Sequence, residues 1–378
     1  MTAEAPNARW RVGRALVAGL VGVFIAAPAA AAPRVASLDY LKLLERYARG
    51  ERAAAVADLG SWTPGELERQ LDAFREGALA SERCPGCPAP LDLGLLPAAV
   101  MLHTDRDEAE RPSWSGVEQA RPCPGFHARI AGQYAHLATL RRENRDFARR
   151  FYLAMSMRCQ WDFCLNEALD WGREGLKRFP RDAELLLAVG STDEEGATLT
   201  DDQVLRFDTR GPRGVSSAGA AREFRFRSAQ RSFAEALSVD PNMLLAELRL
   251  GRVQWRLGAS DAARSALEDV LARASDPRLL YLAHLFLGRV HEDADRREPA
   301  LREYRLALEA DPRSQAAAVA LSHALRQAGD AEGARAALVK TMAFAARYGE
   351  RDAYWNYLMG NAASREELFD ALRKETHR

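Results

Sequence analysis

An Asp-Pro dipeptide recurs at a nearly constant interval in the second half of the chain. It stands at Asp240-Pro241, Asp276-Pro277 and Asp311-Pro312, so successive prolines are 36 and 35 residues apart. Each interval holds two apolar runs with helical spacing, separated by a polar turn such as the one at Gly258. A proline cannot continue the hydrogen-bond ladder of a helix, so we expect it to close the second helix of each pair. The period therefore predicts an all-α solenoid of helical hairpins.

Small residues recur at matching positions of the paired helices. They are Gly251, Gly288 and Ser322 on the first helices and Ala263, Ala300 and Ala334 on the second helices. Two helices approach to about 8–10 Å where small side chains face each other. We therefore expect these six positions to form the contact inside each hairpin.

The order of small and large residues in a helix-turn-helix unit of about 34 residues resembles the tetratricopeptide repeat (TPR). The matching residues are Leu250-Gly251 with Ala263, and Leu287-Gly288 with Ala300 and Tyr304. The family's early Trp is absent, since Glu247, His284 and Ala318 take its place. The resemblance implies a right-handed superhelix whose concave wall, made by the first helices, binds an extended or helical segment of another protein.

The sequence divides into four parts. Residues 1–32 form a signal peptide or a membrane anchor, 33–146 a helical N-terminal cap region with a cysteine-containing loop, 147–346 five TPR-like repeats, and 347–378 capping helices that seal the last repeat. Residues 191–220 are an insertion in the second repeat, rich in Gly, Ser, Thr and Asp. Its acidic residues lack the spacing of a calcium loop, so we expect a solvated loop; they are Asp193, Glu194, Glu195, Asp201 and Asp202.

The N-terminus has the pattern of an export signal. Arg9, Arg11 and Arg14 precede an apolar run, residues 15–32, that ends in small residues with an Ala-x-Ala pattern. We expect cleavage between Ala31 and Ala32 and a periplasmic or extracellular bacterial protein. The alternative is an uncleaved anchor in the inner membrane, because about 18 apolar residues can span a bilayer.

Three cysteines lie in the irregular stretch 81–125, namely Cys84, Cys87 and Cys123. An exported protein favours a disulfide that joins Cys123 to Cys84 or Cys87. The alternatives are a thiol-redox motif at Cys84-Pro85-Gly86-Cys87 and a zinc site that adds His127. His103 follows an apolar helical turn, and we expect it to be a hydrogen-bonded packing residue.

One stripe of residues on the first helices is the candidate peptide-binding groove. Its members are spaced three or four apart within each helix and are Leu245, Leu248, Arg252, Trp255, Leu285, Arg289, His323 and Arg326. Arg252, Arg289 and Arg326 would form a cationic ladder that grips an acidic peptide, because guanidinium groups bind carboxylates bidentately. The alternative is that these arginines pair with glutamates on neighbouring helices.

Charge and motifs limit the function classes. The chain carries 53 basic and 53 acidic residues, which argues against a nucleic-acid partner. The seven histidines are dispersed, and no nucleophile elbow, Ser-His-Asp order or glycine-rich phosphate loop occurs. The sequence predicts a non-catalytic protein-binding scaffold without a cofactor. The alternatives are an envelope assembly subunit, or an enzyme, thiol-redox or metal site in the N-terminal Cys/His region.

Overall fold

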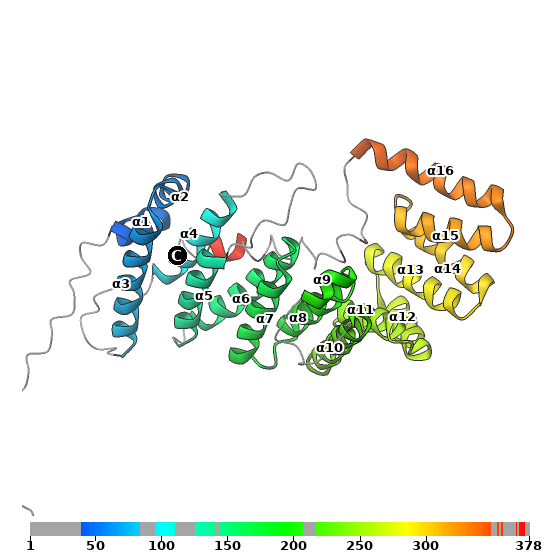
Figure 1. Ribbon diagram of the computed structural model, residues 1–378, viewed down its shortest axis with the longest axis horizontal. Helices are drawn as coiled ribbons and strands as arrows, with labels where there is room; N and C mark the ends of the chain where they lie inside the picture. The colour runs from blue at the N-terminus through cyan, green and yellow to red at the C-terminus, as the bar shows by residue number, and fades with distance from the viewer. Residues whose placement is uncertain are drawn as a thin grey trace, which may run out of the picture.

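The computed structural model describes residues 39–83, 95–109, 125–140, 144–206 and 217–348, together with residues 354, 357, 368 and 370–374. Every regular element in these residues is a helix, which confirms the predicted all-α class. The helices lie side by side in a curved row that begins at α1 and ends at α16 (Figure 1).

The first part of the row holds α1 (Asp39–Ala48), α2 (Arg52–Gly60), α3 (Pro64–Arg83), α4 (Leu96–Ala109) and α5 (Gly125–Leu140). The repeat region follows with α6 (Arg145–Trp161), α7 (Leu165–Arg178), α8 (Ala183–Gly196), α9 (Asp201–Arg206), α10 (Ala218–Val239), α11 (Leu244–Arg256), α12 (Ser260–Arg273), α13 (Pro277–Asp293), α14 (Arg297–Ala310), α15 (Gln315–Gln327) and α16 (Ala331–Tyr348).

Five hairpins make up the repeat region. The pairs are α6 with α7, α8 with α10, α11 with α12, α13 with α14 and α15 with α16, and each second helix also packs on the first helix of the next pair. The first helices α6, α8, α11 and α13 touch one another directly along the row. We call the surface formed by α6, α8, α11, α13 and α15 the first-helix face.

The contact inside each hairpin uses the predicted small residues. A Cβ atom on Gly251 would lie 3.0 Å from Cγ of Leu267, and one on Gly288 would lie 2.6 Å from Cδ1 of Tyr304. Ala263 and Ala300 are buried on the opposing helices. These positions hold the two helices at a distance that a larger side chain would not permit.

The turns inside the hairpins lie where the sequence placed them. Gly258 and Gly329 have φ of +81° and +86°, and Asp295 has φ of 54°, so each turn uses one left-handed residue. The boundary between repeats differs at one proline. Pro277 is the first residue of α13, and Asp276 caps that helix by accepting a hydrogen bond from the main-chain N–H of Arg278. A proline at the first turn costs no helical hydrogen bond, so there it opens the next helix.

The prediction of a solvated loop from residue 191 is wrong for its first residues. Helix α8 continues through Gly196, and Asp193, Glu194 and Glu195 are buried within it. The helix persists because these carboxylates have partners on other helices. Asp201, on the short helix α9, is exposed and forms an ion pair with Arg222.

The structure describes only a few residues of the predicted C-terminal cap, so the cap as a whole stays a prediction; among them, Tyr354 and Tyr357 pack with the hydrophobic core of the last repeats. Tyr354 and Tyr357 pack on Phe286 of α13. Leu372 belongs to the hydrophobic core of the N-terminal helices, and Arg373 forms an ion pair with Asp105 of α4. These last residues, drawn in red, lie beside α4 (Figure 1). Their apolar spacing predicted a buried face, but the spacing does not reveal what covers it.

In the N-terminal part, the hydroxyl of Tyr40 and Nε2 of His103 are 2.8 Å apart inside the core, so His103 is the expected packing residue. Residues 1–38 and Cys84, Cys87 and Cys123 lie outside the described residues, so the export signal, the disulfide and its redox and zinc alternatives stay predictions. Within the described part, none of the helices combines the length and apolar character needed to cross a membrane.

Candidate binding site on the first-helix face

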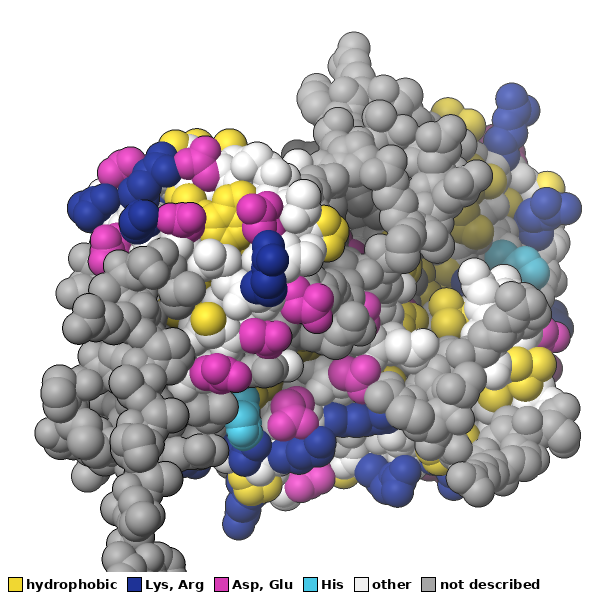
Figure 2. Space-filling view, turned by 60° about the vertical axis from the view of Figure 1, so that its left-hand side comes forward, with side chains coloured by type: hydrophobic (Ala, Val, Ile, Leu, Met, Phe, Trp, Pro, Cys, Tyr) yellow, Lys and Arg dark blue, Asp and Glu magenta, His cyan; other side chains and the backbone are white. Residues whose placement is uncertain are grey.

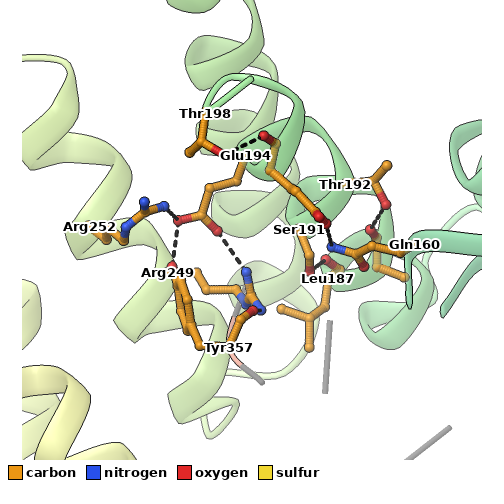
Figure 3. A network of polar contacts seen from close by, with 11 residues as sticks. Gln160, Leu187, Ser191, Thr192, Glu194, Thr198, Arg249, Arg252 and Tyr357 are labelled. Carbon is orange, nitrogen blue, oxygen red and sulfur yellow. Dashed lines mark hydrogen bonds and ion pairs between the residues drawn. The ribbon is translucent and has the colours of Figure 1, made fainter. Parts of the chain in front are cut away.

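Three consecutive acidic residues of α8 are the centre of the site. Asp193, Glu194 and Glu195 have relative exposures of 0%, 1% and 4%. Consecutive helical residues point about 100° apart, so each carboxylate reaches a different neighbour. Glu194 faces α11 (Figure 3). Glu195 faces α6, where Gln160 donates a hydrogen bond to it.

Glu194 binds two arginines of the next first helix. Nη1 of Arg249 donates to its Oε2 at 2.8 Å, and Nη1 of Arg252 donates to its Oε1 at 2.5 Å. Arg249 and Arg252 are three residues apart on α11 and so share one side of that helix. Both guanidinium groups are buried, which makes the ion pairs to Glu194 necessary.

Tyr357 completes the arrangement from a distant part of the chain. Its hydroxyl donates to Oε1 of Glu194, and its main-chain carbonyl accepts from Nη2 of Arg249. Its ring lies 4.1 Å from the Arg249 guanidinium carbon and 5.3 Å, edge to face, from the ring of Phe286. We call Glu194, Arg249, Arg252, Phe286 and Tyr357 the Glu194 cluster. Figure 3 shows Glu194 with Arg249, Arg252 and Tyr357 around it.

The charges of the Glu194 cluster favour a neutral phenol in contact with cations. Burial raises the pKa of Tyr357 well above its ordinary value, and Glu194 acts in the same direction. The hydroxyl therefore stays protonated and donates a hydrogen bond to Glu194. Burial lowers the pKa of Arg252, but the charge of Glu194 and its hydrogen bond raise it, so the pKa of Arg252 is raised overall and the guanidinium stays charged. Two guanidinium groups face one carboxylate, and the electron-rich face of Tyr357 lies against the surplus positive charge.

The two other acidic residues of α8 have separate partners. Asp193 accepts from Nη1 of Arg225 at 3.0 Å and from the hydroxyl of Ser228 at 2.7 Å, both on α10. Glu195 accepts from Nε2 of Gln160 at 2.9 Å, and its Oε1 has no hydrogen-bond partner among the described residues. Burial raises the pKa of Glu195 to about 8, although the Gln160 hydrogen bond partly opposes this. The folded chain therefore holds Glu195 largely protonated near neutral pH.

The stripe predicted as a peptide-binding groove divides into a buried and an open part. Leu248, Leu285 and Arg252 are buried, and Leu245 and Trp255 are partly buried. Indole Nε1 of Trp255 donates to Asp293 at 2.7 Å. At the other end, Arg289 bonds Glu292 of its own helix at 2.9 Å, while His323 and Arg326 on α15 are exposed.

The cationic ladder is thus engaged within the chain at two of its three positions. Arg252 pairs with Glu194 on a neighbouring helix, as in the stated alternative, and Arg289 pairs within α13. Arg326 remains exposed. Whether an acidic peptide binds at this open end stays a prediction.

Three residues that hold the site together, namely Glu194, Arg249 and Tyr357, are not among the predicted site residues. Residues 191–220 are rich in Gly, Ser, Thr and Asp, and this composition predicts a loop at Glu194. One signal was present: residues 191–196 contain no proline and continue the helix of residues 183–190 without interruption. The contact of Tyr357 with Arg249 spans 108 residues, and local periodicity carries no information at that range.

The described residues contain no group of three or more His, Cys, Asp or Glu side chains placed to hold a metal ion. On the face shown in Figure 2, their Lys and Arg side chains lie among Asp and Glu side chains. The described part of that face therefore carries both positive and negative side chains, in keeping with the equal numbers of basic and acidic residues in the chain.

Comparisons with known proteins agree with the repeat architecture. Residues 220–285, which reach from α10 into α13, match the tetratricopeptide repeat family model. Together with the stacked hairpins, this match defines an all-α, TPR-like helical-repeat array. No curated protein shows significant sequence similarity to the chain.

The chain is also similar to several solved structures at low identity. MamA from Desulfovibrio magneticus RS-1 (41-end) is 22% identical, over 53% of this chain and 97% of that one, with a TM-score of 0.39. Pseudomonas aeruginosa pilF is 14% identical, over 60% and 90%, with a TM-score of 0.42. A further MamA crystal structure is 18% identical, over 50% and 96%, with a TM-score of 0.37.

Proposed function

We propose that the chain is a non-catalytic scaffold that binds a peptide segment of a partner protein along its first-helix face. One observation carries this proposal. Tyr357 is held on α8, α11 and α13 by side-chain and main-chain contacts, although it lies 108 residues beyond Arg249 in the sequence. A surface that binds a remote segment of its own chain has the chemistry to bind a segment of another protein. The tetratricopeptide repeat match supports a protein as the partner.

The open end of the first-helix face is where we expect a partner to begin its contact. Val319 on α15 is 55% exposed, and His323 and Arg326 follow on the same side of that helix. An apolar side chain next to an imidazole and a guanidinium group suits a segment with apolar and acidic residues. We therefore retain an acidic peptide as the expected partner class for this end.

Two valines of the same repeat offer a matched test. Val319→Asp places a charge on the first-helix face, and Val339→Asp places one on the second helix α16, where the valine is 61% exposed. Each variant would be used as bait in cross-linking capture from an envelope fraction, and one identified partner would be quantified. We expect at least about a tenfold loss with Val319→Asp and little change with Val339→Asp, because a buried unpaired charge disrupts a contact. Equal capture by both variants would overturn the proposal.

The site of action is proposed to lie outside the cytoplasm. The charged, apolar and small-residue order of residues 9–32 supports this location. The test is fractionation of cells that express the full chain, with N-terminal sequencing of the product. A chain that begins at Ala32 in the periplasmic or secreted fraction is expected, and a chain with an intact N-terminus in the cytoplasm would contradict export.

A further inference from the structure

We propose that the Glu194 cluster is a tyrosine-recognition site, occupied in this structure by the chain's own Tyr357, and that a partner binds by inserting a tyrosine in its place. This inference deepens the proposed function and rests on it. It names the chemical class of the bound residue and identifies the C-terminal segment as an internal competitor. The argument depends on how Tyr357 is held and on what holds it.

The site contacts three different features of the tyrosine. Glu194 accepts the hydrogen bond of the phenol hydroxyl, Arg249 donates to the main-chain carbonyl, and the ring is enclosed by cationic and aromatic groups. The guanidinium carbons of Arg249 and Arg252 lie 4.1 and 5.4 Å from the ring centroid. Phe286 closes the site with an edge-to-face contact at 5.3 Å.

These contacts select tyrosine over phenylalanine. A phenylalanine ring would keep the contacts with Phe286 and the two arginines. It would remove the phenol donor from Oε1 of Glu194, so this carboxylate, which is 1% exposed, would keep only its bonds from Arg249 and Arg252. The loss of a hydrogen bond to a buried charged group is costly, so sites built around a hydroxyl reject the analogue that lacks it. The bond to the main-chain carbonyl is independent of sequence and fits any extended or helical segment that carries the tyrosine.

The C-terminal segment is well placed to compete. Tyr354 comes six residues after the end of α16, and the rings of Tyr354 and Tyr357 stack with centroids 6.4 Å apart. A short tether gives a local concentration on the order of millimolar. Further along, Leu372 and Arg373 hold the segment to the N-terminal helices. A partner segment must therefore bind more tightly than the tethered tyrosine, and removal of Tyr357 should expose the site.

The experiment uses the full chain and a fluorescein-labelled peptide with the sequence of residues 352–362, which contains Tyr354 and Tyr357. Affinity would be measured by fluorescence anisotropy for the wild-type chain and for Tyr357→Ala. We expect Tyr357→Ala to bind the peptide at least about tenfold more tightly than the wild type. A peptide with Phe at the Tyr357 position should bind Tyr357→Ala roughly 10- to 100-fold more weakly than the native peptide.

A second measurement locates the bound peptide without another substitution in the site. Hydrogen exchange of Tyr357→Ala, with and without the native peptide, should show peptide-induced protection in α8 and α11. Absence of binding to Tyr357→Ala, equal binding of the Phe peptide, or protection confined to other helices would each overturn the tyrosine-recognition site.

Failure of this inference is distinguishable from failure of the proposed function. If the peptide measurements fail while partner capture still depends on Val319, the first-helix face binds partners by other chemistry. If the peptide measurements succeed while capture is insensitive to Val319→Asp, the tyrosine-recognition site stands and the proposed function of the open end falls.

Discussion

At the scale of single residues, Glu195 is a carboxyl group that the fold keeps protonated. Burial raises its pKa to about 8, whereas a carboxyl group of this kind in an unfolded chain titrates near 4.5. Between these two values the folded chain binds one more proton than the unfolded chain. The contribution of Glu195 to stability is therefore complete below about pH 4.5 and is lost as the pH rises toward 8.

Glu195→Gln should remove this pH dependence. Glutamine has nearly the same shape, cannot ionise, and can still accept the hydrogen bond that Gln160 donates. At pH 8 we expect the variant to be more stable than the wild type by on the order of 1–3 kcal/mol, and at pH 4.5 to differ little from it. Urea unfolding at the two pH values measures the change.

The control for this prediction is Glu235→Gln, on the exposed side of α10. It should leave the pH dependence of the free energy of unfolding as it is in the wild type. If Glu195→Gln and wild type lose stability in parallel between pH 4.5 and 8, Glu195 is ionised in the folded chain and the raised pKa is refuted.

At the scale of helices, the two helices of a hairpin pack closely where a small residue of one faces a large residue of the other. In the fourth repeat, Gly288 of α13 lies against the fully buried ring of Tyr304 of α14. The Tyr304 hydroxyl also donates to Glu292 at 2.6 Å, which fixes the ring from its other end. The ring cannot move away without breaking that hydrogen bond.

Gly288→Ala should destabilise the chain even though alanine favours helix. Its Cβ atom would lie 2.6 Å from Cδ1 of Tyr304, and overpacking of this kind costs about 1–3 kcal/mol. Gly219→Ala on α10 is the matched control, because nothing lies within 4 Å of its added methyl group. The control should be neutral or stabilising by up to about 1 kcal/mol. Thermal unfolding of the two variants measures both effects, and equal midpoints would contradict the packing argument.

Features that repeat within about 35 residues were predictable from the sequence. The hairpins, the small positions such as Gly288 and Ala300, and the turns at Gly258 and Gly329 all follow from helical spacing and turn chemistry. The Glu194 cluster did not follow, because its residues come from α8, α11 and α13 and from the C-terminal segment. A sequence does not distinguish a buried acidic residue from a solvated one. The distinction requires knowing that the fold brings arginines next to the acidic residue, as it does at Glu194.

At the scale of the whole molecule, the described C-terminal residues contact the middle of the repeat row and the helices at its N-terminal end. In an open solenoid each repeat contacts only its neighbours, so a change near the C-terminus affects the last repeats. Here Arg373 pairs with Asp105 of α4 at 3.1 Å, and Arg52 of α2 donates to the carbonyl of Arg373 at 3.2 Å. The last residues of the chain are therefore part of its N-terminal core.

Leu372→Ala tests this connection. Leu372 is fully buried in the core that contains Tyr40, Leu59 and Met101, so its truncation should weaken that core by about 2–5 kcal/mol. Because stability in a repeat array is local, we expect faster hydrogen exchange in α1, α2 and α4 and unchanged exchange in α13 and α14. Leu205→Ala, at an exposed leucine of α9, should change neither region. Faster exchange in α13 and α14 with the N-terminal helices unaffected would mean that Leu372 packs on the last repeats, and the C-terminal segment would then be the cap that its sequence predicted.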